Sequence, residues 1–212
     1  AIPATSTNDF IFHYGTGLIT TPADGTVGLA QLSATGTKDA TTFLRGDNSF
    51  ATVTSGLTEA DQWRLTTSFN GNANPIASNW ERTDTYGAGY LGTGMTQSSG
   101  IFSFPSTGIY LIGFNMYYHS PTSTNSRYAF AYINTTTDNS TYNTAAYASQ
   151  AVIGNTGGIS HKSMYTQFLF DVTNTSTHKV SFTVEFADTS LGTQGNTNIN
   201  LTHVTFQKLG DT

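Results

Sequence analysis

Short apolar runs with a period of two dominate the chain after Gly56. In the stretch 109–118, the apolar residues of one face occupy every second position: Tyr110, Ile112, Phe114, Met116 and Tyr118. Successive side chains of a strand point to opposite sides of the sheet, so this alternation predicts a half-buried β-strand. Three further runs alternate in the same way: Tyr128-Phe130-Tyr132, Phe168-Phe170-Val172 and Val180-Phe182-Val184-Phe186. No helical stripe extends beyond two turns.

Turn-forming residues separate these runs. The clusters of Gly, Asn, Ser and Thr lie at 70–72, 87–89, 154–158, 174–177 and 192–196. Short strands at regular spacing predict an all-β, antiparallel sandwich or barrel. The final run, 199–206, changes phase at Thr202-His203, which predicts a β-bulge there.

The central run also carries apolar side chains on its second face, at Ile109, Leu111 and Tyr117. A sheet with one buried face should be polar at these positions. Either the second face packs against another subunit, or it lines the other sheet of the same domain. Periodicity leaves both interpretations open.

The first 55 residues differ from the rest. They are small and polar, rich in Gly and Thr, and contain few apolar anchors. Such a segment buries too little apolar surface to fold alone, so we expect an extended stalk or linker over 1–55 that orders by packing in an oligomer. Residues 56–212 form the predicted globular head.

Composition and charge argue against several classes of partner and cofactor. A net charge of −5 argues against a nucleic-acid partner, and no apolar run is long enough for membrane insertion. The chain has no Cys, so it forms no disulfide. It carries no P-loop, nucleophile elbow or dinucleotide fingerprint, and we expect no cofactor.

Two stretches resemble known families. The segment 102–110, with Phe102, Phe104, Pro105, Gly108 and Tyr110, resembles the F-x-x-P-x-x-G-x-Y signature of C1q/TNF-like jelly rolls. The segment 37–51 is similar to a connector phrase of phage tail-fibre and other virion-fibre proteins. Together the resemblances imply a homotrimeric bacteriophage appendage on the virion surface. They also imply that Tyr110 packs inward and that the closing strand 198–208 lies inside the trimer.

The segment 134–163 is the first candidate binding surface. It combines Tyr142 and Tyr147 with Asn139 and Asn143, a composition typical of recognition loops and suited to a host receptor or a surface glycan. The alternative is an additional strand pair, because 142–152 also has β character. Tyr86 and Tyr90, with Trp80, form a second candidate patch near a glycine-rich loop.

Candidates for other chemistry are few. No two His residues have metal-ligand spacing, and we expect no metal site; the one position to examine is His203, which could meet its copies on a threefold axis. We expect Arg45-Gly46-Asp47 to be a turn in which Gly46 has the unusual φ. Glu185 and Asp188 should lie on opposite sides of the pleat, and Asp84 and Asp138 should cap turns.

These observations favour a non-enzymatic trimeric fibre. Its head would bind the host surface, and its N-terminal segment would contact other virion proteins. A rival of the same fold is a capsid decoration or head-fibre protein that stabilises the virion. A rival of another class is a polysaccharide-degrading tail spike, which would need two carboxylates facing each other across a groove.

Overall fold

The computed structural model describes residues 33–52 and 56–212. The chain divides into two compact units, Ala1–Ser55 and Gly56–Thr212. The described residues contain strands and turns but no helix, and therefore none that could cross a membrane. The strands are β1 Thr42–Leu44, β2 Phe50–Thr52, β3 Ala60–Leu65, β4 Phe69–Asn70, β5 Trp80–Arg82, β6 Thr96–Ser98, β7 Ile101–Ser103, β8 Gly108–Ser120, β9 Ser126–Thr136, β10 Asn143–Val152, β11 Ser160–Val172, β12 Lys179–Phe186, β13 Gly192–Thr193 and β14 His203–Gly210.

In the first unit, β1 and β2 pair as a short antiparallel hairpin. The turn between them contains Arg45-Gly46-Asp47, as expected, but the positive φ of 61° belongs to Asn48 and not to Gly46. The Asp47 carboxylate closes the turn by accepting hydrogen bonds from the Ser49 N–H (3.1 Å) and hydroxyl (2.6 Å). The rest of the predicted stalk, 1–32 and 53–55, lies outside the described residues.

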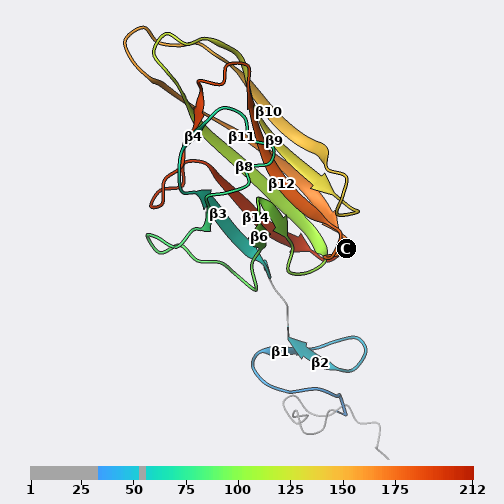
Figure 1. The fold of residues 1–212 in the computed structure, drawn as a ribbon. Coiled ribbons are helices and arrows are strands. Elements are labelled where there is room, and N and C mark those ends of the chain that lie inside the picture. The colour runs from blue at the N-terminus through green and yellow to red at the C-terminus, as the bar shows by residue number, and fades with distance from the viewer. Residues whose placement is uncertain (1–32, 53–55) are drawn as a thin grey trace, which may run out of the picture. The chain divides into compact units, whose positions relative to one another are not determined.

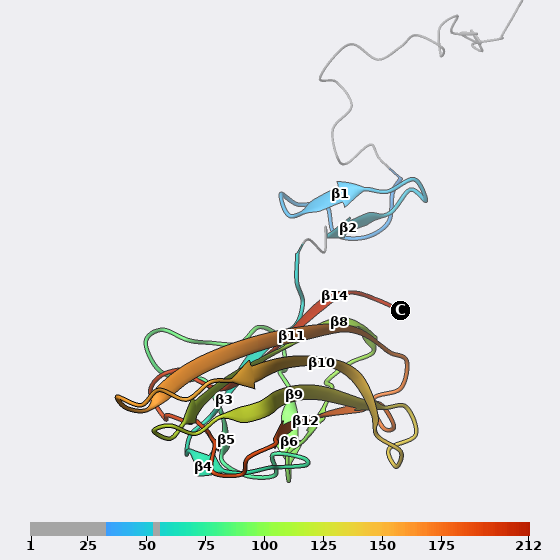
Figure 2. The same cartoon turned by 90° about the horizontal axis from the view of Figure 1, so that it is seen from above.

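The second unit is a sandwich of two antiparallel sheets (Figure 1). One has five strands in the order β10-β9-β12-β7-β6. The other has seven, in the order β4-β13-β8-β14-β3-β5, with β11 paired along the free side of β8. Figure 2 views the sandwich with β8 and β11 in one layer and β9 and β12 in the other. The expected all-β jelly roll is therefore confirmed.

Aromatic rings fill the space between the sheets. Phe102 lies at the centre, with its ring centroid 5.5 Å from that of Phe182, 5.4 Å from Phe206 and 5.6 Å from Trp80. The alternating residues 110–118 of β8 and 180–186 of β12 are all buried here. These rings and aliphatic side chains make one continuous hydrophobic core.

The signature segment contributes directly to this core. Phe102, Phe104, Gly108 and Tyr110 are buried, and Pro105 is half-buried. The Tyr110 ring centroid lies 4.7 Å from that of Phe104, and the Tyr110 hydroxyl donates to the Ser106 carbonyl over 3.1 Å. Tyr110 thus closes the turn between β7 and β8 while its ring packs inward.

Two details differ from the expectations. The closing strand spans His203–Gly210 instead of 198–208, and the phase change at Thr202 marks the strand's start, while the bulge lies between Lys208 and Gly210. In β9 the buried apolar residues are Ala129, Ala131 and Ile133, so the aromatic residues of this strand point outward. The second face of β8, for which the sequence left two interpretations open, points away from the other sheet.

Candidate functional site

The segment 134–163 is mostly strand, so the strand-pair interpretation is correct. A six-residue turn joins β9 to β10 and carries Asn139 and Tyr142; Asn143 opens β10. Asp138 caps this turn: its carboxylate accepts the Ser140 N–H at 2.9 Å and the Thr141 N–H at 2.8 Å. These backbone hydrogen bonds, with one from the Thr136 hydroxyl, hold the pKa of Asp138 well below its usual range.

Tyr147 lies apart from that turn, in the middle of β10 and directly opposite Tyr132 of β9. Its side chain points away from the core and is 59% exposed. Its ring centroid lies 5.6 Å from that of Phe130 and 5.9 Å from that of Tyr132. With Tyr128, whose ring lies 4.9 Å from Phe130, these four residues form what we call the aromatic face.

Glu185 of β12 lies beside the aromatic face. One carboxylate oxygen accepts the Tyr128 hydroxyl and the other accepts the Tyr132 hydroxyl, each over 3.1 Å. Burial and the adjacent carboxylate raise the pKa of Tyr132 to about 12. The two phenol hydroxyls therefore hold the carboxylate in one orientation.

A polar cavity of about 260 Å³ opens at the same place, and we call it the Glu185 cavity. Its lining residues are Asn74, Tyr132, Asn134, Thr144, Thr183 and Glu185. Three hydrogen bonds order its wall: Thr144 donates to Asn134 (3.0 Å), Asn134 to Thr183 (2.9 Å) and Thr183 to Asn74 (2.9 Å).

Tyr86 and Tyr90 lie on the other side of the sandwich, in the connection between β5 and β6. Tyr86 adopts a positive φ of 56° and is 89% exposed. It borders a cavity of about 350 Å³ whose floor includes Gln62 of β3. Tyr90 packs under the Arg82 guanidinium, 4.4 Å from its ring centroid, and borders a second cavity of the same size. Trp80 is instead a core residue, and its indole N–H donates to the Ile76 carbonyl over 2.8 Å.

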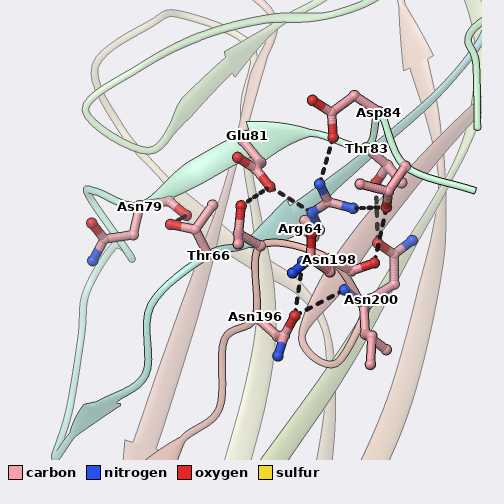
Figure 3. Close-up of polar contacts among 12 residues, drawn as sticks. Arg64, Thr66, Asn79, Glu81, Thr83, Asp84, Asn196, Asn198 and Asn200 are labelled. Atoms are coloured by element: carbon pink, nitrogen blue, oxygen red, sulfur yellow. Dashed lines mark hydrogen bonds and ion pairs between the residues drawn. The ribbon is translucent and has the colours of Figure 1, made fainter.

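An ion-pair network holds the Tyr86 loop on the sheet (Figure 3). Arg64 of β3 is only 1% exposed, although it projects from the outward side of the sheet, because the segments 79–85 and 196–200 cover it. Its guanidinium donates to Glu81 and Asp84 over 2.6 Å each and to the Thr85 hydroxyl over 2.8 Å. Buried charge is tolerated only with such partners.

The outward side of β8 and β11 carries large side chains. Ile109, Leu111 and Tyr117 are half-buried, and Tyr165 and Leu169 are more than half exposed. Leu169 lies opposite Leu111 in the strand register. At Gly113 the absence of a Cβ makes room for the Tyr165 hydroxyl, which an added Cβ would meet at 2.5 Å. We call these five side chains the assembly face.

His203 also projects from the outward side, at the start of β14 and opposite Asn115 of β8. Burial lowers its pKa, although its contact with the Leu201 carbonyl opposes that shift. Within residues 33–52 and 56–212, no three His, Asp or Glu side chains come close enough to hold a metal ion. A site shared by three copies of His203 stays a prediction.

The structure thus separates the sequence candidates into distinct places. Asn139, Tyr142 and Asn143 lie at one turn, Tyr147 lies on the aromatic face, and Tyr86 and Tyr90 lie on the opposite side of the sandwich. Sequence reasoning missed the partners of Tyr147. The available signal was Glu185, a carboxylate at an outward position of β12.

The sequence matches no protein-family model and no curated protein. Among solved structures, the chain is similar to murine APRIL at pH 5.0, with a TM-score of 0.51 and 13% identity over 71% of this chain and 98% of that one. It is also similar to Eiger TNF from S. frugiperda, with a TM-score of 0.54 and 14% identity over 74% of this chain and 96% of that one. At these identities the likeness concerns the fold, and the chain has a TNF-like jelly-roll fold.

Proposed function

We propose that the chain is a homotrimeric, non-enzymatic virion fibre protein whose Gly56–Thr212 unit binds the surface of a bacterial host cell. The observation that carries the proposal is the assembly face on a TNF-like jelly roll. The resemblance of 37–51 to virion-fibre connectors supports the location on a phage particle, with the N-terminal segment contacting other virion proteins.

The assembly face suits contact with further copies of the chain. Its members lie along two adjacent strands that pair without a register shift over their whole length, so they form one continuous surface. A large apolar patch exposed on a soluble protein usually marks an interaction site. Burying the exposed half of Tyr165 or Leu169 would contribute about 1–1.5 kcal/mol each, repeated in every subunit.

The carboxylates near cavities support a binding role over hydrolysis. Glu59 accepts the N–H groups of Thr93 and Gly94, and Asp61 accepts those of Met95 and Arg82, so both carboxylates organise loops. Glu185 is the single carboxylate that lines its cavity. A glycosidase needs two carboxylates flanking the scissile bond.

Sedimentation equilibrium at micromolar concentration tests the assembly. The wild-type chain should have three times the 22.7 kDa of one subunit. Leu169→Asp should yield a folded monomer, because a charge within the assembly face would be desolvated in the trimer. Ile153→Asp, at an exposed position outside this face, should remain trimeric. A wild-type monomer, or a Leu169→Asp trimer, would contradict the proposal.

Immunogold labelling of intact particles tests the location. Label at the tip of a fibre or tail supports host attachment. Label spread over the capsid lattice would instead favour the decoration protein, and unlabelled particles would remove the virion assignment.

A further inference from the structure

The aromatic face presents a platform of packed aromatic rings to solvent. The rings of Phe130 and Tyr132 are nearly parallel, with an interplanar angle of 22° and centroids 5.3 Å apart. Tyr147 stands against both rings from the neighbouring strand and remains largely exposed. The side chains come from adjacent strands of one sheet, so the platform is rigid and complete within a single subunit.

Polar groups border this platform on one side. The Glu185 oxygens each accept one phenol, and each retains a further lone pair for another donor. The Asn74 side-chain oxygen accepts the Thr183 hydroxyl, while its amide nitrogen has no hydrogen-bond partner among the described residues. The site therefore offers a fixed anionic acceptor and an amide donor next to exposed aromatic rings.

This combination matches a sugar ring. The axial C–H groups of a pyranose make an apolar patch that packs on an aromatic ring, while its hydroxyls both donate and accept hydrogen bonds. A cavity of about 260 Å³ falls below the roughly 300–1,000 Å³ of pockets for drug-sized ligands, which suits one ring better than a folded peptide. The lone carboxylate and the net charge of −5 disfavour an acidic sugar.

We propose that the aromatic face and the Glu185 cavity together bind a neutral saccharide unit of a cell-surface glycan. This inference rests on the proposed function and names its ligand class. The Tyr147 ring covers one face of the sugar. Glu185 accepts a hydroxyl, and the Asn74 amide donates to another. The Tyr128 and Tyr132 hydroxyls are positioning groups, because they act through the carboxylate.

A glycan array tests the proposal. The probes are immobilised neutral oligosaccharides of hexose and N-acetylhexosamine, two to six units long, beside the same backbones bearing sialic acid or sulfate. The wild-type chain should bind neutral glycans. Tyr147→Ala and Glu185→Gln should each weaken that binding by about tenfold or more. Tyr147→Phe keeps the aromatic ring, so this variant should still bind neutral glycans.

Ile153→Ala is the matched control, because it removes an exposed apolar side chain just beyond β10 and outside the site. Unchanged melting temperatures establish that every variant is folded. Failure to bind any neutral probe, binding to acidic probes alone, or neutral binding that survives both Tyr147→Ala and Glu185→Gln would overturn the proposal.

The monomeric Leu169→Asp variant separates this inference from the proposed assembly. The site lies within one subunit, so calorimetric affinity per subunit for the best array oligosaccharide should match that of the wild type. A wild-type monomer that still binds neutral glycan would refute the trimer and leave the site intact. A trimer without glycan binding would refute only the site.

Discussion

Removing single partners of Arg64 should destabilise the fold by very different amounts. The guanidinium is buried, the Glu81 side chain is 31% exposed and the Asp84 side chain is 74% exposed. Loss of one partner from a buried ion pair costs about 3–5 kcal/mol, whereas an exposed pair contributes about 0–1 kcal/mol. Because Glu81 is partly solvated, we expect about 3 kcal/mol for Glu81→Ala and under about 1 kcal/mol for Asp84→Ala.

The loss in free energy of unfolding caused by Arg64→Met should fall between these two values. Its three hydrogen bonds disappear, but the freed carboxylates regain water and Met fills part of the space, which gives about 2 kcal/mol. Urea unfolding followed by fluorescence of Trp63 and Trp80 measures all three variants. The chain concentration must be held constant, because assembly shifts apparent stability. Equal losses for Glu81→Ala and Asp84→Ala would refute the argument that the exposure of each partner carboxylate sets the cost.

Two further predictions concern the core and pH. Tyr110→Ala should lower the free energy of unfolding by about 3–5 kcal/mol, because it empties a buried site beside Phe104. Tyr110→Phe should lower it by only about 1 kcal/mol, because a single hydrogen bond is lost. Similar losses for the two variants in urea titrations would contradict this prediction. Burial lowers the pKa of His203 in the folded chain, so the unfolded chain binds the proton more readily, and stability should be full above pH about 6.5 and fall below it. His203→Gln should reduce this decline in melts between pH 7.5 and 5, and an unchanged slope would remove His203 as a cause.

The strands of the head follow from the sequence for a simple reason. Burial of every second residue in 110–118 requires only that one face of a strand meets another layer. The turn at Pro105 and the inward position of Tyr110 followed from the resemblance of 102–110. The pattern in β9 misleads, because it places the bulky residues on one face without saying which face meets the core. Ala129 and Ala131 lie inward, where small side chains leave room for the rings of the opposite sheet.

The grouping of residues into candidate sites depended on tertiary structure more than the strands did. The sequence identified Tyr147, Tyr86 and Tyr90 as exposed aromatic residues, and it grouped Tyr147 with the Asn139 turn. Pairing of β9 with both β10 and β12 instead places Tyr147 and Glu185 on either side of the β9 aromatics. Likewise, Arg64 shows no sequence signal for burial, because loops distant in the chain cover it.

The sequence by itself determined an all-β head after Ser55, its core strands and its turn residues. These properties depend on periodicity and local backbone preference, which act over a few neighbouring positions. The tertiary structure alone decided that Tyr147, Glu185 and Asn74 share one surface, and that the second side of β8, with Ile109, Leu111 and Tyr117, points outward. Strand order and register bring these residues together, and both are set by contacts between segments far apart in the chain.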